Sequence, residues 1–429
     1  MTPLQNSNHH PPPASQAEPT PEAWIGLDWG NRQHAFALED RSGRRERGTL
    51  EHSSENLHHW LGQIGQRYGG RPVLLAIEAS RGAVIHALLN YAWLTIYPIN
   101  PLTSARYRQA FTPSGAKDDL PDADVLLELG RDHTAKLRPL EVQDDLTVKL
   151  AELVHARRDI VDRRTQTINQ TTSLLKTYYP QSLTLTGDLK HEMALDFLKR
   201  WPDLISLKAA KPATLKRFYF QHNVRSTELV QERLQFIRQA VALTTQEARV
   251  SVAVLQLQHL LEQLCTFRKH IAIFDHEIKN AFRQHPEAEL FRDLPGAGAQ
   301  MAPRLCVAFG TLRTVYPDPA SLQKYAGVAP VREKSGNQLW THWRWQASGF
   351  LRQTFVEWAG LTVVYCPWSG AYYERMKKKG KKHAAILRAL AFKWIRILWK
   401  CWMDRKPYNQ VLYLKQLIHR KSPNAVPVD

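Results

Sequence analysis

The order of apolar segments between residues 23 and 100 constrains the fold of this chain more than any other feature. Three short β-rich segments come first, and an amphipathic helix follows them, with Ser53 or Ser54 as its cap. Strand, helix and strand then alternate. The apolar face of the first helix would consist of Leu57, Trp60, Leu61 and Ile64, and we expect a second helix at 82–92. Strands are expected at 23–30, 34–40, 48–53, 72–80 and 94–100. This order predicts a mixed sheet covered by helices.

Four carboxylates lie where such a layer would bring them together. Asp28 and Glu78 each end a short apolar run that is typical of a buried strand. Asp119 and Asp122 are three residues apart at the start of a predicted helix and so share a face. Acidic groups gathered in this way repel each other unless a hard cation neutralises them, and oxygen-only ligands suit Mg²⁺ or Mn²⁺. Two such ions about 3.5–4 Å apart are the usual means of displacement at a phosphodiester.

Two nearby aspartates are expected to face elsewhere. Asp118 points away from the face that Asp119 and Asp122 share, and Asp124 lies about 200° around the helix from Asp122. The predicted elements follow the order of a ribonuclease-H-like (RuvC-like) α/β domain, in which a three-strand meander is followed by alternating helices and strands. The acidic residues then fall at the first strand, the fourth strand and a later helix. We predict this domain at 23–142, after a disordered arm at 1–22.

The composition indicates a polyanionic partner. The chain has 58 Lys and Arg against 40 Asp and Glu, a net charge of +18 and a pI near 9.8. No apolar run reaches the roughly 18 residues of a membrane span, so no membrane partner is expected. The cysteines lack any pairing or metal-ligand spacing, which favours reduced thiols in a cytoplasmic protein. They are Cys265, Cys306, Cys366 and Cys401.

The middle of the chain, residues 143–290, is predicted to be all-α. Proline and glycine are scarce there, and apolar residues recur at helical spacing. Long helices are expected at about 145–178 and 226–284, with a break near Thr244 and Thr245. A solvated helical spacer is one interpretation, and a dimerising coiled coil or nucleic-acid clamp is the other. The heptads are too irregular to decide between them.

Residues 291–410 form an aromatic, basic and mainly helical region, and 411–429 a basic tail. A Pro-Gly-x-Gly turn opens a helix at 294–310, as in a helix-hairpin-helix module that holds a phosphate with backbone N–H groups. A tight interhelical turn is the alternative, and the basic surroundings favour phosphate contact. The residues predicted to contact nucleic acid are Gly296, Gly298, Arg304, Lys324, Arg332, Lys377, Lys378, Lys379, Lys381 and Lys382.

A serine in the same region is a candidate nucleophile. Ser335 lies between Lys334 and Gly336, in a predicted loop with Arg332 nearby. Flanking cations could stabilise the charge that builds up on an attacked phosphate. A Ser-Gly pair in a loop is by itself much more often a turn, and no adjacent histidine supplies a base.

The succession of these motifs resembles the insertion-sequence transposases that join a RuvC-like DEDD domain to a C-terminal serine domain. Their relatives include Piv-type DNA invertases and bridge-RNA-guided recombinases. In the N-terminal part the resemblance rests on Asp28, Glu78, Asn100-Pro101 and the helix start at 117–123. In the C-terminal part it rests on Pro295–Gly298, Tyr325–Pro330, Ser335-Gly336, Leu351-Arg352, Gly380-Lys381 with Ala384, and Tyr408. The family's Lys-Arg-Gly-Asn is replaced here by Trp345-Gln346-Ala347-Ser348.

The resemblance implies a DNA recombinase of a bacterial, nucleoid-associated kind. Asp28, Glu78, Asp119 and Asp122 would bind Mg²⁺, and Ser335 would attack DNA to give a covalent serine–DNA intermediate and a free 3′-hydroxyl. A structured RNA from the element would guide the enzyme by base pairing. Active sites would be composite, with the serine domain of one protomer meeting the DEDD domain of another in a dimer or tetramer.

Two other functions stay open on the sequence. One is a junction-resolving nuclease, in which metal-activated water attacks DNA and Ser335 is only a turn residue. The other is a non-catalytic nucleic-acid-binding derivative of such an element. The presence of all five candidate catalytic residues favours an active enzyme.

Overall fold

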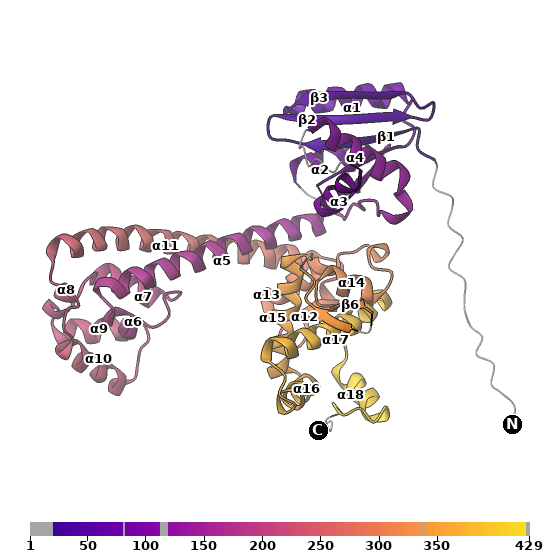
Figure 1. The fold of residues 1–429 in the computed structure, drawn as a ribbon. Helices are drawn as coiled ribbons and strands as arrows, with labels where there is room; N and C mark the ends of the chain where they lie inside the picture. Colours follow the sequence, from indigo (N-terminus) through magenta and orange to yellow (C-terminus); the bar gives the residue numbers. More distant parts are fainter. Residues whose placement is uncertain (1–19, 80–81, 112–118, 337, 346, 426–429) are drawn as a thin grey trace, which may run out of the picture. The chain divides into compact units, whose positions relative to one another are not determined.

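The chain divides into two compact units, one ending at Val142 and the other beginning at Gln143 (Figure 1). This computed structural model describes residues 20–79, 82–111, 119–336, 338–345 and 347–425, without the side chains of 111, 119 and 120. The predicted arm at 1–22 lies almost wholly outside these residues. Each unit is described by itself below.

The first unit is built on a five-stranded mixed sheet with the order β3-β2-β1-β4-β5. Strands β1, β2 and β3 form an antiparallel meander, and β4 and β5 continue the sheet parallel to β1. The strands span Ala23–Trp29, Gln33–Asp40, Arg45–Glu51, Val73–Ile77 and Leu94–Pro98. This is the ribonuclease-H-like arrangement that the order of segments predicted, so the predicted fold class is confirmed.

Helices cover both faces of this sheet. On one face α1 (Ser54–Arg67) and α2 (Ala83–Leu88) pack on the apolar side chains of β1, β4 and β5. Ser53 caps α1, accepting a 3.1 Å hydrogen bond from the Asn56 N–H, and the predicted apolar face of α1 is buried. On the other face lie α3 (Pro101–Phe111) and α4 (Asp119–Asp132).

A glycine sets how closely α4 approaches the sheet. A Cβ atom added to Gly26 in β1 would lie 2.0 Å from the carbonyl oxygen of Ala123 and 2.4 Å from the backbone nitrogen of Leu127. The backbone of α4 therefore lies directly on β1, which any side chain at Gly26 would prevent. This contact fixes the first turns of α4 beside the end of β1.

Two long helices organise the second unit. They are α5 (Asp145–Tyr178) and α11 (Glu247–Gln284), and they run antiparallel. The pairs Thr147–His285 at 2.8 Å, Arg157–Asp275 at 2.6 Å and Thr167–Gln263 at 3.4 Å step along both helices in opposite directions. The helix predicted at 145–178 is confirmed. The break expected near Thr244 separates α10 (Thr227–Gln239) from α11.

A small helical core lies at one end of this pair. It packs α6 (Gln181–Thr186), α7 (Glu192–Arg200), α8 (Leu204–Ala209) and α9 (Pro212–Gln221), together with α10, against the C-terminal part of α5 and the N-terminal part of α11. These helices give the middle region a folded core of its own, which a bare helical spacer would lack.

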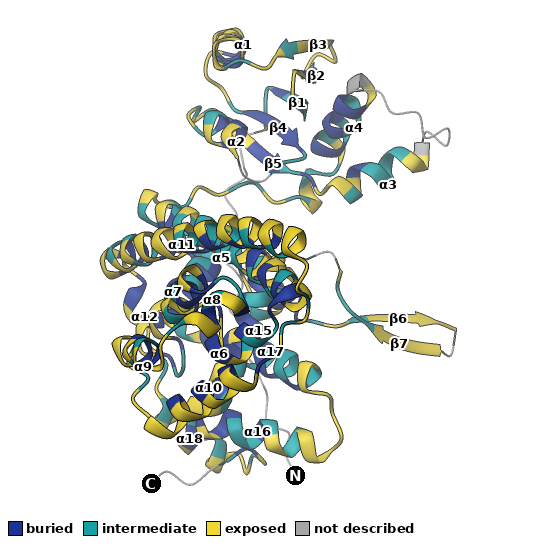
Figure 2. Ribbon diagram, turned by 90° about the vertical axis from the view of Figure 1, so that its left-hand side faces the viewer, coloured by how far each residue is buried: buried dark blue, intermediate teal, exposed yellow. Residues whose placement is uncertain are grey.

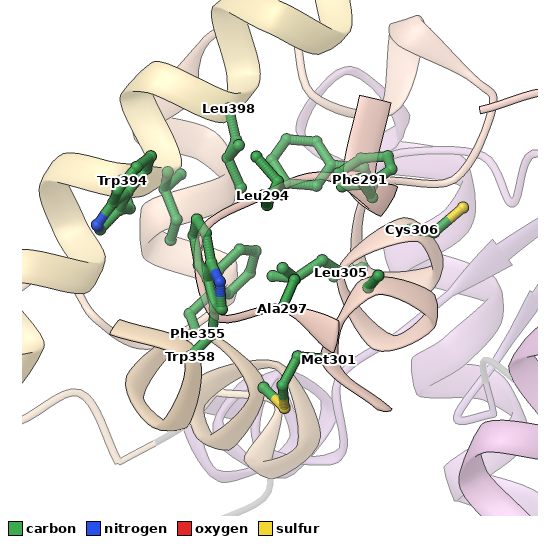
Figure 3. Close-up of a cluster of buried hydrophobic side chains, with 14 of the residues drawn as sticks. Phe291, Leu294, Ala297, Met301, Leu305, Cys306, Phe355, Trp358, Trp394 and Leu398 are labelled. Atoms are coloured by element: carbon green, nitrogen blue, oxygen red, sulfur yellow. The ribbon is translucent and has the colours of Figure 1, made fainter. Parts of the chain in front are cut away.

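The opposite ends of α5 and α11 join a core rich in tryptophan (Figure 3). Trp358, Trp368, Trp394 and Trp402 are among its largest fully buried side chains, so much of the C-terminal tryptophan serves packing. Its helices are α12 (Ala288–Arg292), α13 (Gly298–Phe309), α14 (Pro319–Tyr325), α15 (Gly349–Tyr365), α16 (Pro367–Lys378), α17 (His383–Asp404) and α18 (Gln410–His419).

Two features of this region differ from the sequence-based expectation. Residues 411–429 were predicted to be a basic tail, yet α18 begins at Gln410, runs through their first part and buries Leu414 in the same core. Strands β6 (Val331–Ser335) and β7 (Gln338–His342) form an exposed hairpin that protrudes from the helices (Figure 2). No helix in the described parts of the chain is long and apolar enough to cross a membrane.

Candidate functional site

Asp28 and Glu78 lie at the ends of two neighbouring strands. Parallel β1 and β4 are in register at Leu27 and Ile77, and each carboxylate is the next residue. Asp28 is paired with Ala35, which packs in the small core beneath α4, so Asp28 belongs to the α4 face of the sheet. The end of β4 carries Glu78 to α3, where the Ser104 hydroxyl donates a hydrogen bond to its Oε1. The structure thus brings these two predicted site residues to one corner of the sheet.

Asp122 reaches the same face from α4. It precedes Ala123, whose carbonyl lies on β1 at Gly26, and it is only 8% exposed. Nη2 of Arg108, on α3, lies 2.7 Å from its Oδ1. The guanidinium supplies positive charge to a carboxylate that is nearly buried, an environment in which an uncompensated charge is costly.

The remaining aspartates of the segment are only partly described. Asp119 is the first residue of α4, but its side chain lies outside the described part of the structure, as does the whole of Asp118. Asp124 turns away from Asp122 and lies 2.9 Å from Arg47 on β3. This is the direction that the helical spacing predicted for it.

The oxygen ligands at this corner suit a divalent metal ion, although the described carboxylates do not surround a common point. Asp28, Glu78 and Asp122 offer carboxylate oxygens alone, which are the ligands that Mg²⁺ and Mn²⁺ prefer. Among the described side chains, no three acidic, histidine or cysteine groups converge closely enough to hold a metal ion. In this arrangement Ser104 contacts Glu78 and Arg108 contacts Asp122. The predicted convergence on a single point is therefore not present among these side chains.

Ser104 and Arg108 contact the candidate ligands, and neither was predicted from the sequence. They are four residues apart on α3 and face the carboxylates together. Ser104 is 1% exposed, which is unusual for a serine. The signal available in the sequence was a polar pair at helical spacing directly after the Asn100-Pro101 motif.

Ser335 lies in a hairpin and not in the predicted loop. It is the last residue of β6, pairs with Gln338 across the turn and is exposed. Alternation along the strand places Ser335 on the face of Glu333 and Trp340, and Arg332 and Lys334 on the opposite face. The cations that flank the serine in sequence therefore do not share its face, so the local charge stabilisation expected from them is absent from the hairpin itself.

His342 and Glu333 form a contact on the serine face of this hairpin. Nε2 of His342 lies 2.7 Å from Oε1 of Glu333, and Nδ1 lies 2.9 Å from the carbonyl oxygen of Trp343. Both ring nitrogens face acceptors, an arrangement that favours the protonated imidazole. The Trp343 carbonyl and Glu333 raise the pKa of His342, while His342 and Trp340 lower that of Glu333.

The glycines of the Pro-Gly-x-Gly turn have two different surroundings. A Cβ added to Gly296 would lie 2.9 Å from Leu361 and Tyr365, so this glycine allows close packing on α15. A Cβ added to Gly298 would meet no described atom within 4 Å. Arg304, predicted to contact nucleic acid, has a side chain only 12% exposed, 2.7 Å from Glu357 and hydrogen-bonded to Thr354. In this structure Gly296 packs on α15 and Arg304 pairs with Glu357, and their contact with nucleic acid stays a prediction.

The other predicted nucleic-acid contacts are exposed. Lys324 lies near the end of α14, and Arg332 lies on the hairpin face opposite Ser335. Five lysines form an exposed group around the C-terminal end of α16, where the helix dipole also favours cations. This group, called here the lysine run, comprises Lys377, Lys378, Lys379, Lys381 and Lys382.

Known proteins show the same two-part organisation. Residues 25–180 match a family model described as "Transposase", for a DEDD domain of the IS110 type, and residues 288–374 match one described as "Transposase IS116/IS110/IS902 family". The chain is 30% identical over 404 residues to the mini-circle putative transposase for IS117 of Streptomyces coelicolor, with 90% of this chain and 95% of the relative covered. It is 25% identical to the uncharacterized 42 kDa protein of insertion element IS900 of Mycobacterium paratuberculosis, with 90% and 97% covered.

Proposed function

The chain belongs to the IS110/IS116/IS902 family of transposases, and on this premise we propose that it cleaves and rejoins DNA with Ser335 as nucleophile and Asp28, Glu78, Asp119 and Asp122 as the metal-binding group. Family membership implies DNA binding, phosphoryl transfer and the use of a divalent metal. The identity of the ion as Mg²⁺ or Mn²⁺, guidance by a structured RNA of the element, and a dimer or tetramer with composite sites are parts of the proposal.

The observation that supports it most is the pairing of Asp28 and Glu78 at one corner of the sheet. Residues fifty positions apart in sequence come to adjacent strand ends, and Asp122 reaches the same face from α4. When bound, a divalent ion would neutralise phosphate charge there and acidify a coordinated hydroxyl. Asp28, Glu78 and Asp122 would hold the ion, with Asp119 as a fourth ligand.

The serine step would conserve atoms and charge. The Ser335 oxygen bonds to phosphorus, the bond from phosphorus to the 3′ oxygen breaks, and the proton lost by the serine is balanced by the one that the leaving 3′ oxygen takes up. His342 is not placed as a base for the serine, because its two ring nitrogens contact Glu333 and the Trp343 carbonyl instead. Activation would therefore come from the carboxylate cluster of the same chain or a neighbour.

A metal-water nuclease is the second candidate, and the hairpin geometry favours it in one respect. Arg332 and Lys334 lie on the face opposite Ser335, so the hairpin alone gives this serine little help as a nucleophile. In such an enzyme the carboxylates would act on water, and Ser335 would be dispensable.

The deciding experiment compares Ser335→Ala with Gln338→Ala, its partner across the hairpin. Full-length protein is incubated with Mg²⁺, DNA carrying the element's ends and RNA transcribed from its flanking segment, and denaturing gels detect a protein–DNA adduct. We expect the adduct and strand joining with the wild type and Gln338→Ala, and neither with Ser335→Ala at unchanged DNA affinity. Full activity of Ser335→Ala would favour the metal-water nuclease.

A further inference from the structure

A basic groove lies between α17 and α18, and of the motif residues named above only Tyr408 is among its lining. Its volume is about 610 Å³, and it is open to solvent. Five cations line it, and Asp404 is the one acidic residue among its lining. The five are Lys393, Arg396, Lys400, Lys406 and Arg420.

Most of the cations of this groove have no acidic partner among its lining residues. Asp404 is engaged by Lys400, with Nζ and Oδ1 2.9 Å apart, so five cations and one carboxylate leave a net charge of +4. Arg375 adds a further cation next to the groove, since it donates a 2.6 Å hydrogen bond to the lining residue Asn424. Like charges this crowded raise the energy of the empty groove, and an anion would relieve the repulsion.

Lys393 shows this crowding most clearly. Its side chain is partly buried and lies 5.2 Å from the ring of Tyr372. Burial, Arg375 and Arg396 together hold the pKa of Lys393 below its usual value. Such a lysine has lost hydration without gaining a carboxylate partner from the groove lining.

Aromatic side chains give the groove a shape suited to more than a small ion. Tyr408 and Tyr413 lie in its wall with their rings 5.9 Å apart, and Trp368 donates a 3.0 Å hydrogen bond to the Tyr408 hydroxyl. A lining that holds both cations and aromatic rings suits a strand whose phosphates need charge and whose bases can stack on rings.

We propose that the groove between α17 and α18 binds the phosphodiester backbone of a nucleic-acid strand through Lys393, Arg396 and Arg420. This deepens the proposed function and rests on it, since both need a nucleic-acid substrate. The groove differs from the lysine run, which surrounds the end of α16 and whose members do not line it. DNA and RNA share the chemistry that would be recognised, so the experiment must separate them.

The test removes two groove charges and compares them with two charges elsewhere. The groove variant is Arg396→Gln with Arg420→Gln, and the control is Arg283→Gln with Arg292→Gln, two exposed arginines of the same unit. Fluorescence anisotropy measures the affinity of the full chain for a single-stranded DNA and an RNA of the same sequence, at several salt concentrations. Circular dichroism and the unfolding temperature confirm that both variants fold.

We expect the groove variant to bind roughly tenfold more weakly at low salt, with the slope of log affinity against log salt shallower by about 1 to 2, while the control changes less. A loss of affinity for RNA alone, for DNA alone or for both supports strand binding in the groove and identifies which nucleic acid binds there. Equal losses in groove variant and control, or none in either, would overturn it. The proposed function fails separately if Asp28→Asn retains strand joining, an outcome that leaves binding in the groove untouched.

Discussion

Arg108 on α3 lies 2.7 Å from the carboxylate of Asp122 on α4, and this ion pair holds one of the proposed metal ligands in place. Ser104, on the same helix, donates a hydrogen bond to Glu78. One face of α3 therefore contacts two of the four candidate ligands, and the charge on Asp122 is compensated before any metal binds.

Replacing Arg108 by Gln should destabilise the first unit by about 1–3 kcal/mol, because the nearly buried Asp122 loses its cation. Added Mg²⁺ should stabilise this variant more than the wild type, in which the ion must compete with the guanidinium. Thermal unfolding with and without Mg²⁺ measures both effects. Arg106→Gln, an exposed change on the same helix, is the control and should alter neither. Identical unfolding of the Arg108 variant and the wild type would show that the pair contributes nothing.

Mixing an Asp28→Ala chain with a Ser335→Ala chain should restore strand joining if active sites are composite. Each variant lacks one half of the chemistry, and a mixed oligomer would contain one intact site made from both chains. The measurement is joined product from the mixture against each variant alone. Its control is a mixture of Asp28→Ala with Glu78→Ala chains, both damaged in the same cluster. Recovery in that control as well would remove the support for sites shared between protomers.

Neutralising the lysine run should lower affinity for all DNA sequences about equally. Lysine acts as a point charge on phosphate and lacks the planar fork with which arginine reads guanine. Changing Lys377, Lys378, Lys379, Lys381 and Lys382 to Gln should make the slope of log affinity against log salt shallower by up to about 4 to 5, since each phosphate contact contributes close to 1. Binding titrations on several sequences test this. A loss confined to one sequence with an unchanged slope would contradict it.

The hairpin that carries Ser335 should be most ordered at pH values between the usual pKa of a carboxyl group and that of an imidazole. The pKa of His342 is raised, so its contribution is present below about 6.5 and is lost as the pH rises through the raised value. The pKa of Glu333 is lowered, so its contribution is present above its usual value and is lost as the pH falls through the lowered one. NMR titration of His342 should show its pKa falling in Glu333→Gln. An unchanged value would mean that the pair does not form in solution.

Several elements could be predicted because their causes are local. The Ser53 cap and the apolar face of α1 follow from residue types a few positions apart, and so do the bounds of α5. Asp124 likewise turned away from Asp122, as the pitch of one helix requires. The strand order was also predictable, since meander and alternation leave few ways to arrange five strands.

Other features depend on contacts between distant segments, which no local pattern records. Arg304 was predicted to contact phosphate, and the sequence does not indicate that it pairs with Glu357 on another helix. Ser335 and its flanking cations are neighbours in sequence, yet the pairing of β6 with β7 puts them on opposite faces, because successive side chains of a strand alternate. The sequence by itself determined the strands of the first unit, the bounds of α5 and the carboxylates of the candidate site. Only the tertiary structure decided which charges meet, because charge pairing depends on distance in space and not on separation along the chain.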